Sequence, residues 1–236
     1  MLYRLRKTCG KARACISCWR RISCFHINEA NEHLEVYGVS RDITDRKRSQ
    51  AVFELRLELL EFAGQHSLDE LMTFALDKIT ALTDSPIGFI HFVEADQQTL
   101  SLQAWSTRTL QEYCRTEGNG RHYDLSKAGI WADCVRLRKP LIHNEYLLES
   151  GHKGLPTGHA ELARELVAPV FRGEKIVSIL GVGNKAIPYA DKDVEIVSNM
   201  ADMVWEIIQR KKSEQALTDI EALLQLFSHN LNDDPG

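Results

Sequence analysis

The chain has 236 residues, of which 44% are hydrophobic and 26% charged, and its formal net charge is −4. This composition is ordinary for a folded protein of one or two domains and does not favour an intrinsically disordered chain. The small negative charge gives no general case for binding nucleic acid or a membrane surface, and no apolar run reaches the ~20 residues of a membrane span.

The N-terminal region is basic, with no acidic residue before Glu29, and it contains the cysteines Cys9, Cys15, Cys18 and Cys24. A basic start is typical of a transit peptide or a nucleic-acid-binding arm, but the apolar residues lack helical periodicity, which favours strands with a solvated basic face. Only Cys15 and Cys18 have the close spacing of zinc ligands. We therefore expect free thiols here and no metal.

Residues 12–43 have the pattern of two or three strands, and the last strand runs into Ser40–Arg48. This junction resembles the end of PAS sensor domains, where a strand leads into a charged helix start. A complete small domain of this kind has ~100 residues, so residues 1–45 are expected to be a partial PAS remnant without haem or flavin. Residues 46–66 are predicted to form a linker helix that Gly64 interrupts.

The next segment begins with Ser67–Glu70, a Ser-x-x-Glu capping box that predicts a helix start. That helix ends before Pro86, because the residue preceding a proline disfavours helical geometry. The β-prone runs 87–93 and 99–105, joined by a polar turn, predict two neighbouring strands.

In the middle of the chain, Ser126 is expected to start a helix that ends near Arg138, and residues 141–143 are predicted to form a strand. The segment 144–159 is rich in glycine and irregular. Long irregular segments in compact domains are often functional, so this segment is a candidate for a binding loop.

The strands 166–171 and 175–182 are apolar at both odd and even positions, which predicts strands covered on both faces. The glycines at the end of the second strand, Gly181 and Gly183, are interpreted as a tight turn. A helix is predicted from Asp191, and its apolar pattern continues in a shifted phase after Arg210. The predicted class is thus α+β: an antiparallel sheet with flanking helices, and long N- and C-terminal helices.

The element order, together with Gly129–Cys134, Pro140–Tyr146 and Gly181–Lys185, resembles the GAF family of small-molecule-sensing domains. The expected boundaries are a GAF domain at 67–210 and a C-terminal linker helix and tail at 211–236. The resemblance implies a non-catalytic, cytoplasmic sensory module. Its flanking helices would relay ligand binding to a histidine kinase or another output partner.

The GAF resemblance implies a ligand pocket between the sheet and the loops that cover it. The candidate site residues are Trp105, Trp131, Cys134, His143, Asn144, Tyr146, His159 and Arg164. Trp131 is also compatible with a core position, and Arg164 with an ion pair to Glu161 or Glu165. His143, His159 and Cys134 are far apart in sequence, so neither a metal nor another cofactor is expected.

Two other functions stay open on the same fold. Free methionine sulfoxide reductases resemble GAF domains with redox cysteines at the pocket, which would give Cys114 or Cys134 a catalytic role. A dimerisation scaffold without a ligand is the other. The apolar stripes before Gly64 and after Arg210 favour a parallel homodimer in either non-catalytic case. His229 loosely resembles a kinase phosphoacceptor, although Pro235 is one position too far from it.

Overall fold

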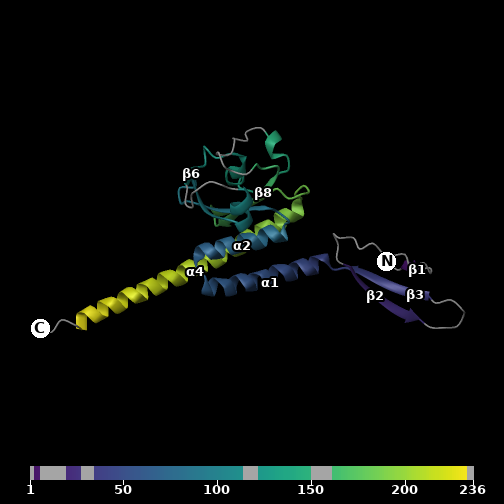
Figure 1. Cartoon of the computed structure of the whole chain (residues 1–236), viewed down its shortest axis with the longest axis horizontal. Helices are drawn as coiled ribbons and strands as arrows, with labels where there is room; N and C mark the ends of the chain where they lie inside the picture. The colour runs from purple at the N-terminus through teal and green to yellow at the C-terminus, as the bar shows by residue number, and fades with distance from the viewer. Residues whose placement is uncertain (1–2, 6–19, 28–34, 114–121, 150–160, 233–236) are drawn as a thin grey trace. The chain divides into compact units, whose positions relative to one another are not determined.

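The computed structural model describes residues 3–5, 20–27, 35–113, 122–149 and 161–232 (Figure 1). The chain divides into two units, Met1–Leu55 and Arg56–Gly236. The first unit contains a three-stranded antiparallel sheet in the order β1-β3-β2. Its strands are β1 (Tyr3–Leu5), β2 (Arg20–Ile27) and β3 (Glu35–Asp42). The last two fall inside the predicted strand region, whereas Cys9, Cys15 and Cys18 lie outside the described residues.

The second unit is built on a six-stranded antiparallel sheet in the order β6-β5-β4-β9-β8-β7, which confirms the predicted class. The strands are β4 (Ile87–Val93), β5 (Thr99–Trp105), β6 (His122–Asp124), β7 (Leu141–His143), β8 (Glu165–Arg172) and β9 (Lys175–Gly183). The central position of β4, β9 and β8 explains their apolar residues on both faces. The short strand β6 was not predicted.

Two helices cover one face of this sheet, α2 (Leu68–Leu82) and α4 (Asp191–Asn232) (Figure 1). The C-terminal part of α1 (Thr44–Gln65) packs against these helices, with Glu58 paired to Lys78 and Phe62 stacked on Phe74. On this face the ring of Phe92 in β4 meets that of Trp205 in α4 edge to face, with ring centroids 5.2 Å apart. The capping box at Ser67 is confirmed, because Ser67 and Glu70 bond each other's backbone N–H. The predicted linker helix is α1, which ends at Gln65, within one residue of the predicted end near Gly64.

The other face carries two short helices, η2 (Ile130–Ala132) and α3 (Asp133–Arg136), where the sequence predicted one longer helix from Ser126. The guanidinium of Arg136 explains the difference. It donates to the carbonyls of Leu125, Ala128 and Gly129, whose oxygens in a continuous helix would accept from the backbone. The segment before Ile130 is thereby held outside helical geometry.

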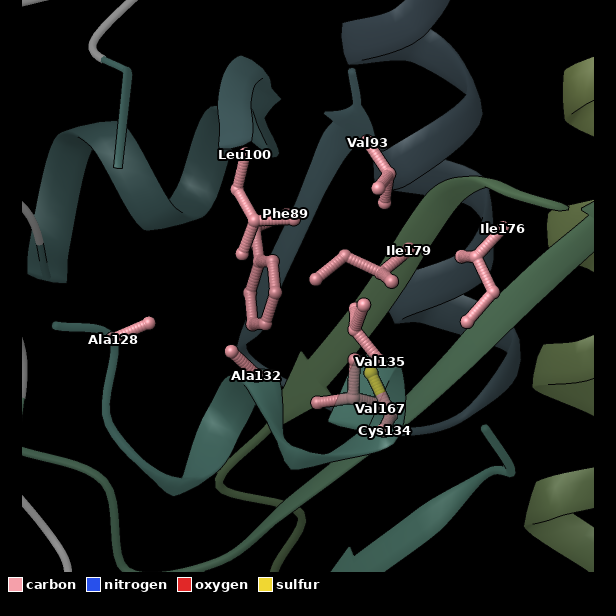
Figure 2. Close-up of a cluster of buried hydrophobic side chains, with 10 residues drawn as sticks. All are labelled: Phe89, Val93, Leu100, Ala128, Ala132, Cys134, Val135, Val167, Ile176 and Ile179. Atoms are coloured by element: carbon pink, nitrogen blue, oxygen red, sulfur yellow. The ribbon is translucent and has the colours of Figure 1, made fainter. Parts of the chain in front are cut away.

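A cluster of buried apolar side chains fills the space between this face of the sheet and the short helices (Figure 2). Figure 2 shows the ring of Phe89 near Ala132, and the sulfur of Cys134 beside Val135 and Val167. Cys134 is fully buried in this cluster, and its Sγ makes only a weak contact of 3.9 Å with the carbonyl of Trp131, so it packs as a small apolar side chain. None of the helices among the described residues has both the length and the apolar character needed to cross a lipid bilayer.

Candidate functional site

A buried acid and a histidine meet where β7 pairs with β8. The antiparallel register places His143 opposite Glu165, and cross-strand neighbours share one face of a sheet. Nδ1 of His143 lies 3.0 Å from Oε1 of Glu165. The Glu165 side chain is completely buried, whereas the other carboxylate oxygen, Oε2, has no hydrogen-bond partner among the described residues. A buried carboxylate oxygen of this kind is unusual and calls for an explanation.

The pair has perturbed proton affinities. The hydrogen bond to Glu165 raises the pKa of His143, an effect that outweighs the opposing desolvation. Burial raises the pKa of Glu165, although the bond to His143 partly offsets that rise. Both groups therefore hold their protons to higher pH than they would in an unfolded chain.

Tyr146 brings a second polar group to the same region. It opens the short helix η3 (Tyr146–Leu148) just after β7, and its backbone N–H donates to the carbonyl of Ala163 at 3.0 Å. The side chain is only 1% exposed, and its Oη has no hydrogen-bond partner in the part of the chain that the structure describes. Burial, followed by the nearby charge of Glu165, raises the pKa of Tyr146, which keeps the phenol protonated.

Gly129 shows how closely Trp131 and Tyr146 approach each other. A Cβ atom added at Gly129 would lie 3.2 Å from Cδ1 of Trp131 and 3.6 Å from Oη of Tyr146. The unpartnered phenol oxygen therefore lies beside the Trp131 indole, with only a glycine between them. A larger residue at Gly129 would project between these two side chains.

Aromatic rings continue from Trp131 across the sheet. The centroid of the Trp131 ring lies 4.9 Å from that of His91 and 6.3 Å from that of Phe89. Phe89 also meets Trp105 edge to face, at 5.7 Å. Gly181 makes room for the Phe89 ring, because a Cβ at Gly181 would lie 2.1 Å from it. The interpretation of this glycine as part of a turn was wrong, since it lies within β9.

The structure thus brings Trp105, Trp131, His143 and Tyr146 to one face of the sheet, opposite the long helices. Reasoning from the sequence missed Phe89, His91 and Glu165. One sequence feature could have pointed to Glu165: it is an acidic residue directly before the apolar run 166–171. From the sequence, Glu165 is considered only as an ion-pair partner of Arg164.

Two other candidates hold loops in place. The side-chain amide of Asn144 bonds both the backbone N–H and the carbonyl of Tyr189, at 2.8 and 3.0 Å. Nη1 of Arg164 donates to the carbonyls of Lys185 and Ala186, at 3.0 and 2.9 Å. These contacts fix the loop after β9. The alternative ion pair of Arg164 with Glu161 or Glu165 is not formed among the described residues, and its ligand role stays a prediction.

The structure tests the thiol reductase alternative only at Cys134. Cys114 and His159 lie outside the described residues. Burial raises the pKa of the Cys134 thiol, so its thiolate is scarce near neutral pH. That environment does not suit a redox nucleophile. Among the residues that the structure describes, no group of three His, Cys, Asp or Glu side chains could hold a metal ion.

Comparison with known proteins identifies the family. A model of the GAF domain family matches residues 65–209. A methyl sulfide methyltransferase-associated sensor from Methanosarcina acetivorans is 38% identical over 190 residues. That match covers 77% of this chain but only 19% of the relative, so the chain spans about a fifth of the relative's length.

Solved structures share the fold at low identity. The GAF domain of a phosphoenolpyruvate-protein phosphotransferase from Coxiella burnetii aligns with a TM-score of 0.56 and 10% identity, covering 71% of this chain and 98% of that domain. A free methionine-R-sulfoxide reductase from Neisseria meningitidis aligns with a TM-score of 0.53 and 8% identity, covering 69% of this chain and 91% of the enzyme. At such identities the likeness concerns the fold alone.

Proposed function

The chain belongs to the GAF domain family, and on that premise we propose that it is a sensory module that binds a small molecule and relays binding through its helices. The observation that carries the proposal is a pair of buried oxygens, Glu165 Oε2 and Tyr146 Oη, without hydrogen-bond partners among the described residues. Buried polar groups in folded proteins are nearly always satisfied, so a bound molecule would complete this arrangement.

Strand β8 offers a route from this site to the long helix. Successive side chains of a strand point to opposite faces, so Glu165 and Val167 face the site while their neighbours face α4. At the end of β8, Nη1 of Arg172 lies 2.5 Å from a carboxylate oxygen of Asp202 in α4. A ligand that favours one position of β8 would therefore shift the preferred position of α4.

The named relative supports an assignment to signalling. It is described as a sensor, and the match covers most of this chain. We infer that this chain forms a corresponding sensory segment, whose output passes to a histidine kinase or another signalling partner. The non-catalytic assignment is supported by the buried, protonated state of Cys134.

A homodimer is the proposed working state. Beyond the sheet, α4 exposes the apolar residues Leu217, Ile220 and Leu224, whose side chains are 54–63% exposed. Residues three and four positions apart lie on one face of a helix, so these side chains form a continuous stripe. The same stripe of a second copy would cover them in a parallel coiled coil.

Native mass spectrometry of the full chain after mild purification tests the sensory proposal. We expect a bound small molecule in the wild-type protein and its loss from Gly129→Val, whose side chain would project towards Trp131 and Tyr146. Gly64→Ala is the matched control, because a Cβ at Gly64 meets no atom within 4 Å. A wild-type chain that carries no small molecule, and binds none from a protein-free cell extract, would contradict the proposal.

A further inference from the structure

On the premise of the sensory function above, we propose that the ligand is a small protonated amine. Its N–H groups would donate to Glu165 Oε2 and Tyr146 Oη, and its hydrocarbon part would lie against the indole of Trp131. The proposal concerns primary and secondary amines, which carry at least two N–H groups when protonated.

The buried carboxylate determines the sign of the ligand charge. One oxygen of Glu165 is occupied by His143, while the other is buried and has no partner among the described residues. Burial favours the protonated form of Glu165 in the free protein, whereas an ammonium ion at the second oxygen would favour the ionised form. That form only accepts hydrogen bonds, and a charged donor gives the strongest ones. Asp133 and Glu149 add further negative potential at Glu165. An anionic ligand would meet repulsion from these carboxylates, whereas an ammonium ion would take the place of the proton that burial otherwise holds on Glu165.

The phenol is compatible with the same ligand. The oxygen of a protonated tyrosine can accept a hydrogen bond as well as donate one. Tyr146 Oη and Glu165 Oε2 do not bond each other, although the charge of Glu165 acts on the phenol. A protonated amine carries at least two N–H donors, so one ligand could donate to both oxygens, which a ligand with a single donor could not.

The side chains around Tyr146 favour a ligand with an apolar body. Tyr146 is packed with the buried residues Ile87, Ile130 and Leu162. Trp131 lies near the phenol oxygen, across Gly129. The face of an indole attracts a cation and also packs against hydrocarbon, so a short alkyl ammonium ion matches both properties.

Calorimetric titration of the full chain with four probes tests the proposal. Ethylammonium and pyrrolidinium carry the proposed chemistry, while acetate is an anion and dimethyl sulfide is a neutral thioether. We expect the two amines to bind at least about tenfold more tightly than the other probes, the gain of a charged hydrogen bond. We also expect Glu165→Gln to weaken amine binding by about tenfold or more.

Two conservative variants separate a loss of amine binding from a loss of folding. Tyr146→Phe removes only the phenol oxygen and should weaken amine binding several-fold. Glu161→Gln removes an exposed carboxylate from the same part of the chain and should bind amines like the wild type. Equal amine binding by wild type, Glu165→Gln and Tyr146→Phe would overturn the proposal, because the amine would then bind elsewhere.

The outcomes separate this proposal from the sensory function. If neither amine binds but dimethyl sulfide or acetate does, and Gly129→Val abolishes that binding, the sensory function holds and the amine assignment fails. If no probe binds and native mass spectrometry finds no small molecule, both fail.

Discussion

The imidazole of His143 and the buried carboxylate of Glu165 make the stability of the domain depend on pH. Both pKa values are raised in the folded protein, that of His143 by its bond to Glu165 and that of Glu165 by burial. A folded state that holds protons more tightly than the unfolded state loses stability as pH rises. The loss extends from the ordinary pKa of a glutamate upwards through the raised pKa of His143.

We predict that the free energy of unfolding falls between pH 5 and pH 9 in the wild type, and that Glu165→Gln reduces this fall. Urea denaturation at a series of pH values measures the effect, in the absence of any ligand. Glu161→Gln, which removes an exposed acid, should keep the wild-type slope. A Glu165→Gln variant with an unchanged slope would show that other groups determine the pH dependence.

Individual residues differ in how far the sequence could foretell them. Tyr146, Trp131 and His143 could be chosen because polar and aromatic residues gather beside an irregular segment. Glu165 could not, because its burial depends on the register between β7 and β8, which is a long-range property. The contacts of Asn144 with Tyr189 likewise join residues that are distant in sequence.

At the scale of secondary structure, the pairing of β4 with β9 depends on a glycine. Phe89 lies opposite Gly181, and a Cβ at that glycine would lie 2.1 Å from the ring. We predict that Gly181→Ala destabilises the domain by about 1–3 kcal/mol, the usual cost of overpacking a core. Thermal or urea unfolding measures this change.

The double variant Gly181→Ala, Phe89→Leu tests the mechanism. The smaller leucine side chain at position 89 should relieve the clash, so the two changes should cost less together than the sum of their separate effects. Gly64→Ala is the control and should leave stability unchanged or raise it by up to about 1 kcal/mol, because Gly64 lies in a helix. Strict additivity of the two core changes would argue against the proposed contact.

Elements with strong local signals could be predicted from the sequence. The bounds of β4 and β5 agree with the predicted runs, and the capping box located the start of α2. The prediction of a helix from Ser126 failed because the side chain of Arg136, within the same segment, bonds the carbonyls of Leu125, Ala128 and Gly129. Helical propensity does not describe such competition between a side chain and the backbone.

For the molecule as a whole, we predict a dimer that depends on the exposed stripe of α4. Leu217→Ser combined with Leu224→Ser removes two apolar side chains that are 58% and 63% exposed. Analytical ultracentrifugation at micromolar concentration should find a dimer for the wild type and a monomer for this variant. Thr218→Ser, at an exposed position between the stripe residues, should stay dimeric. A monomeric wild-type chain would refute the prediction.

The length of α4 has a mechanical consequence for signalling. A continuous helix of 42 residues extends for about 63 Å, and the part after Arg210 accounts for roughly half of it. A rigid rod of this kind acts as a lever arm whose pivot lies against β8. A tilt of about 5° at the pivot would move a point roughly 33 Å further along the rod by about 3 Å. On the proposed sensory function, a small tilt of α4 at β8 would thus become a displacement at the far end of the helix that is large enough to change side-chain packing.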